Sequence, residues 1–137
     1  MTLPNNLALR LVEDADSYVS ADTPNIQMIA NRAWIGPREE FRVVSLPNSV
    51  YALKSSTGKF VQVHDDNKLY PDGEVSTDLR CQFQIMQAAG GGAQNVTLQS
   101  MQNKLYWSVR ENASKWLECS VKTPQGWETF HYRGIEG

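Results

Sequence analysis

Two tryptophans are the residues of this sequence best suited to holding a ligand. The chain has four tryptophans, and Trp34 precedes Ile35-Gly36-Pro37, a segment whose composition predicts a turn. Trp107 lies in a short alternating run in the C-terminal part of the chain. An exposed indole ring can stack on the apolar face of a sugar ring, and it can equally anchor a protein interface. We therefore take Trp34 and Trp107 as candidate ligand-binding residues.

Polar side chains that could bond to the hydroxyl groups of a ligand gather in two predicted turns. One turn follows Trp107, and the other follows the strand-like run that ends at Val63. Carboxylate, amide and guanidinium groups offer the donors and acceptors that hydroxyl groups need. The alternative for any one of these residues is a solvated turn with no ligand. The candidate polar ligand-binding residues are Arg110, Asn112, Asp65 and Asn67.

Catalytic and metal-binding chemistry finds little support in the sequence. The two histidines, His64 and His131, lie outside any nucleophile motif, so we interpret them as surface or rim residues. Paired carboxylates such as Asp65-Asp66 lie in predicted turns, where solvated aspartates are common. No His/Cys group has zinc spacing, and no calcium loop is complete. We predict no catalytic residue, no metal site and no cofactor, and a protein that is not an enzyme.

Composition narrows the class of partner and the compartment. The 137 residues carry a net charge of −2, and a chain of this length can bury a core without disulfides. Without a basic excess or an apolar run of about 20 residues, neither nucleic-acid binding nor membrane insertion is expected. The first residues do not read as a signal peptide, so we expect the cytoplasm, with secretion the alternative if a leader has been removed. Cys81 and Cys119 are expected to be buried free thiols.

A threefold internal repeat provides the elements that must position these residues. Leucine and phenylalanine recur at matching places in three segments, which we assign to residues 7–46, 51–87 and 96–133. A repeat period of about 45 residues indicates symmetric units that share one core. The matching residues are Leu9, Leu53 and Leu98, followed by Phe41, Phe83 and Phe130.

Each unit contains short runs in which apolar and polar residues alternate. Phe83 and Ile85, for example, alternate with Gln82 and Gln84, and period two is typical of a strand with one buried face. Turn residues separate about four such runs in each unit, or about twelve strands in all. Three units are too few for a propeller, which needs about four blades or more. The prediction is an all-β, β-trefoil fold over residues 1–137, a barrel capped by hairpins with threefold pseudosymmetry.

Aligning the three units separates core residues from candidate surface residues. Trp107 aligns with Ser20 and Gln62, which are polar, so it is either an exposed binding platform or a local repacking of the core. Two aligned sets are expected in the core: Tyr18, Phe60 and Leu105, and Met28, Leu69 and Trp116.

Three segments, residues 28–41, 51–61 and 126–130, resemble the fascin-like branch of the β-trefoils. They read MIANRAWIGPREEF, YALKSSTGKFV and GWETF, and that branch typically carries "l-anR", "alkS-tGkyvsa" and "g-WE-F". The resemblance extends over nearly the whole chain and implies the same fold. Members of the branch bind actin, sugars or membranes through different surfaces, so the resemblance does not name a ligand.

Where this sequence departs from the fascin-like pattern, some functions of that branch are not expected. The tryptophan of "WE-F" survives only as Trp127, and Arg38 and Arg80 hold the equivalent places. The histidine clusters of hisactophilin are missing, so we expect no membrane switch driven by histidine protonation.

The leading hypothesis is a lectin-like module that binds a carbohydrate or glycoconjugate through surface loops and exposed aromatic residues. It depends on the fold, on the resemblance to modules found beside carbohydrate-active enzymes, and on Trp34 and Trp107. The alternative is a protein-interaction module, either actin-associated or an inhibitor of a partner such as a protease. An actin bundler needs two filament sites, and fascin obtains them by linking several trefoils.

Overall fold

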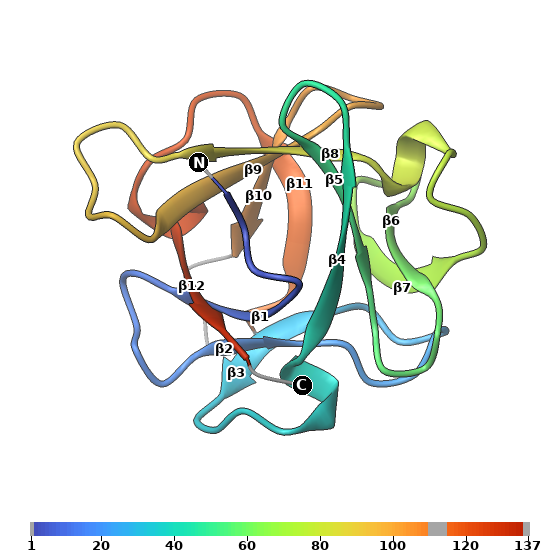
Figure 1. Cartoon of the computed structure of the whole chain (residues 1–137), viewed down its shortest axis with the longest axis horizontal. Coiled ribbons are helices and arrows are strands. Elements are labelled where there is room, and N and C mark those ends of the chain that lie inside the picture. The colour runs from blue at the N-terminus through green and yellow to red at the C-terminus, as the bar shows by residue number, and fades with distance from the viewer. Residues whose placement is uncertain (1, 110–114, 136–137) are drawn as a thin grey trace.

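The computed structural model describes residues 2–109 and 115–135, which form twelve β-strands and three single turns of 3₁₀-helix. The strands fall into three groups of four (Figure 1). The first group contains β1 (Asn6–Leu11), β2 (Tyr18–Ser20), β3 (Ile29–Arg32), η1 (Pro37–Glu39) and β4 (Phe41–Leu46). The second contains β5 (Val50–Lys54), β6 (Phe60–Val63), β7 (Leu69–Gly73), η2 (Leu79–Cys81) and β8 (Phe83–Gln87). The third contains β9 (Asn95–Ser100), β10 (Tyr106–Val109), β11 (Leu117–Val121), η3 (Gly126–Glu128) and β12 (Phe130–Gly134).

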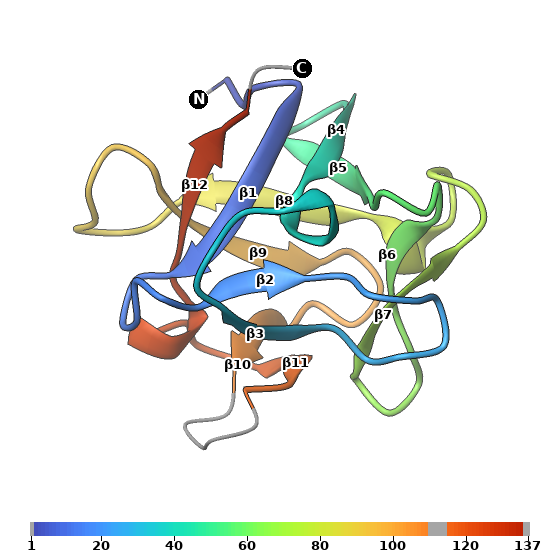
Figure 2. The same ribbon diagram turned by 90° about the horizontal axis from the view of Figure 1, so that it is seen from below.

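The first and last strands of each group close into a barrel. Antiparallel pairing runs in the order β1, β4, β5, β8, β9, β12 and back to β1. Figure 2 shows the closing pair, β12 beside β1, which joins the two ends of the chain. Closure removes the open edges that a flat sheet would expose.

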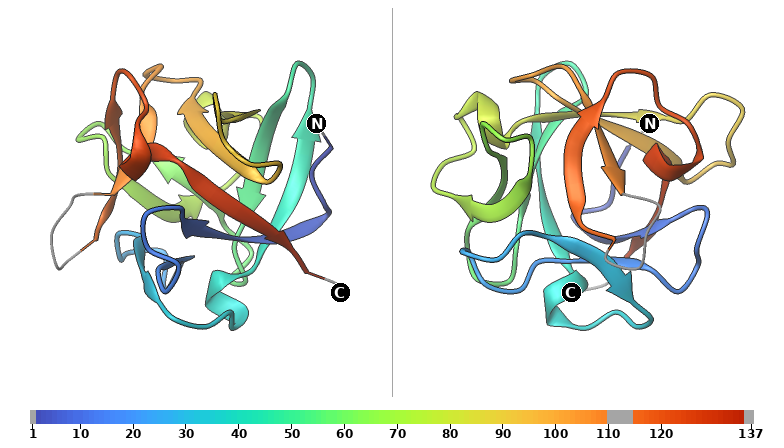
Figure 3. Two further views of the ribbon diagram at one scale, coloured as in Figure 1. Left: turned by 90° about the vertical axis from the view of Figure 1, so that its left-hand side faces the viewer. Right: turned by 180° about the vertical axis from the view of Figure 1, so that it is seen from behind.

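The middle strands of each group form three hairpins, β2–β3, β6–β7 and β10–β11, which meet at one end of the barrel (Figure 3, right). Backbone hydrogen bonds join each hairpin to the next. The Met28 N–H donates to the Leu69 carbonyl at 2.9 Å, and the Leu117 N–H donates to the Met28 carbonyl at 2.9 Å. A barrel of this order capped by three hairpins is a β-trefoil, which confirms the predicted fold.

The repeat residues line one interior. Leucine and phenylalanine side chains from all three groups are at most 1% exposed and belong to a single hydrophobic cluster. The alternation of apolar and polar residues therefore predicted correctly which face of each barrel strand is buried. The residues concerned are those expected from the sequence: Leu9, Leu53 and Leu98, and Phe41, Phe83 and Phe130.

Trp107 is a core residue, so its prediction as a surface binding platform is wrong. Its side chain is 0% exposed. The indole ring lies edge-on to Phe83 at 5.2 Å between ring centroids and edge-on to Phe130 at 6.1 Å. The pairing Trp107↔Cys119 matches Val19↔Ala30 in the first unit. Trp107 thus fills the interior place of a valine, which is the repacking alternative.

The same one-residue shift moves Trp116 out of the core. Tyr106, rather than Leu105, matches Tyr18 at the start of its strand. Tyr18, Leu105 and Tyr106 are all only half-buried. Leu117, rather than Trp116, joins Met28 in the cap and is 0% exposed, whereas Trp116 is 38% exposed. A shift of one residue turns every side chain of a strand to the opposite face, which explains why Trp107 and Trp116 were misassigned.

Each 3₁₀ turn ends on a buried residue that holds the turn to its unit. Glu39 Oε1 accepts a hydrogen bond from the Gly36 N–H at 2.8 Å, and Glu128 Oε1 accepts one from the Gln125 N–H at 2.9 Å. Ser108 Oγ also donates to Glu128 Oε2 at 2.7 Å. The second unit has Cys81 in this place, 0% exposed. Trp127, Arg38 and Arg80 occupy the middle of the three turns, as the alignment predicted.

We predict that Trp107→Ala will lower the free energy of unfolding by about 3–5 kcal/mol, because it empties a large, fully buried aromatic site. Denaturant unfolding followed by circular dichroism measures this. Trp116→Ala is the matched control and should cost less than about 1 kcal/mol, since that ring is partly in solvent. Equal losses in the two variants would contradict the placement of Trp107 inside the core.

Candidate functional site

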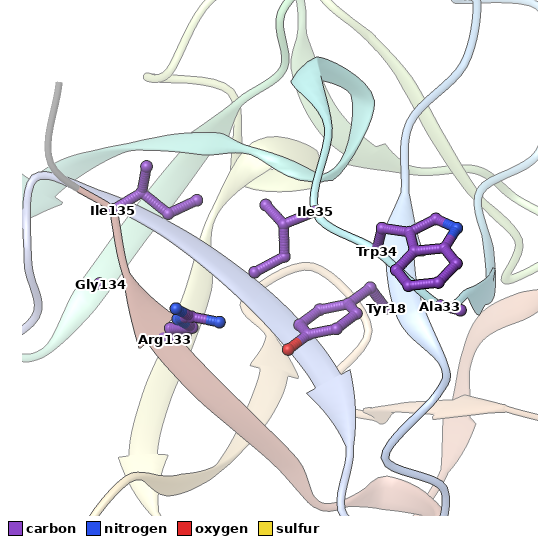
Figure 4. Close-up of a pocket in the computed structure, with 7 residues that line it drawn as sticks. All are labelled: Tyr18, Ala33, Trp34, Ile35, Arg133, Gly134 and Ile135. Carbon is purple, nitrogen blue, oxygen red and sulfur yellow. The ribbon is translucent and has the colours of Figure 1, made fainter.

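A hollow with a volume of about 660 Å³ lies beside Trp34. Its side chains come from parts of the chain that are far apart in sequence: Tyr18, Trp34, Ile35, Arg133 and Ile135. In Figure 4 the hydroxyl end of Tyr18 points toward Arg133, and Trp34 stands on the opposite side of the tyrosine ring. The hollow is open to solvent and combines two aromatic rings, aliphatic carbon and one guanidinium group.

Local structure explains how these side chains come together. Tyr18 begins β2, where it pairs with Arg10 on β1 and Arg32 on β3. Trp34 lies two residues beyond the end of β3, in the connection to η1. Arg133 lies near the end of β12, opposite Ala8 on β1. Closure of the barrel by β12 and β1 therefore brings the last strand of the third unit to the first hairpin.

Trp34 is exposed as predicted, with 81% of its surface in contact with solvent. A second hollow of about 300 Å³, lined by Arg32, Pro37 and Arg38 among others, also borders its indole ring. Exposing so large an apolar side chain costs free energy that burial against a partner would recover. Among large apolar side chains of the described residues, Trp34 is therefore the one most available for a ligand to cover.

A third hollow, polar and about 400 Å³ in volume, lies in the second unit and contains Asp65. Arg80 Nη2 lies 2.8 Å from Asp65 Oδ1. On the same hollow, the His64 ring nitrogen Nε2 lies 2.8 Å from Asp72 Oδ2, and the ring stacks on Tyr70 with centroids 4.3 Å apart. These groups already satisfy one another, so Asp65 offers a ligand only its remaining acceptor positions.

Asn67, another predicted ligand-binding residue, contributes to the fold. Its backbone has φ of 68°, a left-handed conformation that asparagine tolerates better than most residues. Its carbonyl accepts a hydrogen bond from the Cys119 N–H at 2.7 Å, and its Oδ1 accepts one from Asn103 Nδ2 at 3.2 Å. Asn67 thus ties the second hairpin to the third and does not line the hollow that contains Asp65, and its role in ligand binding stays a prediction.

Two other predicted site residues, Arg110 and Asn112, lie outside the described residues. Two residues that the sequence reasoning missed, Tyr18 and Arg133, are brought to Trp34 by the barrel. Tyr18 was assigned to the core, and Arg133 had no local signal, because its neighbours in space are set by the closing strand pair.

Neither cysteine, Cys81 or Cys119, is activated as a nucleophile. Burial raises the pKa of Cys81 to about 12 and that of Cys119 to about 12, so both remain protonated at neutral pH. Burial, together with the charge of Arg10, lowers the pKa of His131, whose Nδ1 lies 2.9 Å from Asn95 Oδ1.

Among the residues described, no three His, Cys, Asp or Glu side chains gather as a metal site would need. The same residues contain no helix long and apolar enough to cross a membrane.

The profile of the Fascin domain matches residues 15–132. The chain belongs to the fascin family. No curated protein sequence matches it. The match confirms the resemblance that segments 28–41, 51–61 and 126–130 carry, including the "WE-F" turn.

Solved structures agree on the fold at low sequence identity. The designed threefold-symmetric protein ThreeFoil superposes with a TM-score of 0.83 at 10% identity, over 96% of this chain and 99% of its own. A protein described as the BEL beta-trefoil gives 0.81 at 13% identity, over 98% and 97%. The Polyporus squamosus lectin, solved with the epitope Neu5Aca2-6Galb1-4GlcNAc, gives 0.81 at 6% identity, over 98% of this chain and 50% of the lectin. Identities this low establish shared architecture alone.

We predict that both thiols of the native protein will resist alkylation at pH 8. With a pKa of about 12, roughly one thiol in ten thousand is ionised there, and the thiolate is the reactive form. In denaturant, both should react at the rate of free cysteine. The variants Cys81→Ala and Cys119→Ala each leave one thiol to follow, and fast labelling of either folded variant would contradict the assignment.

Proposed function

We propose that this chain is a non-enzymatic binding module that holds a carbohydrate at the hollow beside Trp34. The observation that carries the proposal is the 81% exposure of that indole over a hollow of about 660 Å³. Hollows of roughly 300–1,000 Å³ are the usual size for small-ligand sites. A tryptophan that is neither packed into the core nor shielded by a neighbour offers a flat apolar ring to a ligand.

The chemistry of the lining fits a sugar. A pyranose ring has an apolar C–H face and a rim of hydroxyl groups, so it needs an aromatic surface beside polar donors and acceptors. Trp34 and Tyr18 offer the aromatic surface, and the Tyr18 hydroxyl and the Arg133 guanidinium offer the polar atoms. Because the hollow is open, we expect weak binding at a single site that increases when sites are displayed together.

The comparisons support this choice without deciding it. The Polyporus squamosus lectin, solved with a sugar epitope, has the same fold at 6% identity. The Fascin domain match is equally compatible with a protein ligand such as actin. A protein-interaction module remains the second candidate, because exposed tryptophan and arginine beside isoleucine also form the centre of many protein interfaces.

We predict that Trp34→Ala will weaken binding to any glycan identified on an array by tenfold or more, a loss of about 1.4 kcal/mol or greater. The array should be followed by calorimetry with the isolated glycan. Trp116→Ala is the control, since it removes another exposed indole that does not line the hollow, and it should leave affinity unchanged.

The protein-interaction candidate predicts a different outcome. It requires an array without hits and a partner retained from lysate by the wild-type chain and by Trp116→Ala, but not by Trp34→Ala. Glycan affinity that is unchanged in Trp34→Ala would reject the proposed site even if the chain binds sugar elsewhere.

A further inference from the structure

The sheet beside Trp34 presents a row of basic side chains. Strand pairing places His131 on β12 opposite Arg10 on β1, Arg10 opposite Tyr18 on β2, and Tyr18 opposite Arg32 on β3. Directly opposed residues of an antiparallel sheet project from the same face. Arg133, two residues beyond His131 on β12, projects from that face as well. Three arginines therefore surround Tyr18 at the edge of the Trp34 hollow.

Within the described residues these three arginines have no carboxylate partner, in contrast to Arg38 and Arg80. Arg38 lies 3.0 Å from Asp22, and Arg80 lies 2.8 Å from Asp65. For Arg10, Arg32 and Arg133, no ion pair is formed with any residue in the ranges 2–109 and 115–135. Within the part of the chain that the structure describes, the Arg10 guanidinium donates to the neighbouring Leu11 carbonyl alone, at 3.1 Å.

The acidic side chain that lines a hollow together with Arg32 is already engaged. Glu39 lines the second hollow with Arg32 and Trp34, but it is 6% exposed and accepts the Gly36 N–H. The whole chain has a net charge of −2, so this basic face runs against the overall charge. Unpaired guanidinium groups beside a concave aromatic surface attract an anion, and the planar fork of arginine matches a carboxylate or sulfate with two parallel hydrogen bonds.

We infer that the ligand of the Trp34 hollow is an anionic saccharide, with its carboxylate or sulfate on Arg133 and its ring on Trp34 and Tyr18. This inference depends on the proposed carbohydrate binding and names the substrate class. Arg133 is the arginine that lines the hollow itself, and its guanidinium faces the hydroxyl end of Tyr18 in Figure 4. Arg10 and Arg32 flank Tyr18 and raise the positive potential without having to touch the sugar.

A saccharide fits this surface better than a nucleic acid. Single-stranded nucleic acid is bound along an extended basic groove with successive stacking rings. Here the basic group is three arginines around one tyrosine, and the polar hollow of the second unit contains Asp65 and Asp66 beside its one arginine, Arg80. A compact ligand with one or two negative charges matches the extent of the patch.

The test compares three oligosaccharides of one backbone, which carry a uronic acid, the corresponding carboxyl-reduced neutral sugar, or a sulfate ester. The wild-type chain should bind at least one acidic form tenfold or more tightly than the neutral form at low salt. The carboxylate and sulfate arms identify which anion is preferred. The preference should shrink as salt is added, because exposed charge pairs are screened.

Variants assign the effect to Arg133. Arg133→Gln should remove the preference, so that the acidic and neutral sugars bind with similar affinity, while Arg133→Lys should retain part of the preference, because it keeps the charge without the fork. Arg42→Gln, at an exposed arginine on β4 that lines a different hollow, is the control and should behave as wild type. Circular dichroism confirms that each variant is folded.

The outcomes separate this inference from the proposed function. Equal binding of acidic and neutral sugars, or an unchanged preference in Arg133→Gln, would overturn the inference while the proposed function survived. Absence of binding to all three sugars would overturn both. Tighter Arg133-dependent binding of a single-stranded oligonucleotide than of any sugar would also overturn it.

Discussion

The structure depends on three phenylalanines meeting in one interior. Phe41, Phe83 and Phe130 each follow a 3₁₀ turn and begin a barrel strand, and each is completely buried. A unit of four short strands has one apolar face and nothing of its own to cover it, so each unit is stable only against the other two. The residue at the end of each turn, Glu39, Cys81 or Glu128, is buried, and the two glutamates close their turns by accepting a backbone N–H. Symmetry in the interior is thus a packing requirement, and the surface is left free to differ among units.

The hollow beside Trp34 is a consequence of that closure. Tyr18 and Trp34 belong to the first unit and Arg133 to the third, and the pairing of β12 with β1 is what brings them together. The second unit carries a polar hollow whose groups bind one another, with Arg80 on Asp65 and His64 on Asp72. The boundary between the first and third units therefore has an open aromatic and basic surface, while the second unit carries mutually paired charges.

The fold could be read from the sequence because its signals are local and repeated. Leucine and phenylalanine anchors, alternation and turn residues predicted twelve strands and a shared core, and the turn before Gly36-Pro37 predicted the exposure of Trp34. The third unit was misread because the β10 strand is displaced by one residue from the simplest alignment. Trp107 was thereby placed among polar residues when it occupies a valine position, and Trp116 was placed in the core. Arg133 could not be predicted, since only the closing strand pair sets its neighbours.

The unlike surroundings of the tryptophans give the molecule built-in optical reporters. Trp107 is sealed between aromatic rings, and its indole N–H has no acceptor among the described residues. Trp34, in contrast, is almost fully hydrated. Indole emission shifts to the red in water, so the blue component of the spectrum comes from the barrel interior and the red component includes the rim of the hollow. Loss of the first follows collapse of threefold packing, while quenching of the second follows occupation of the surface, and the two events can be told apart in one unlabelled sample.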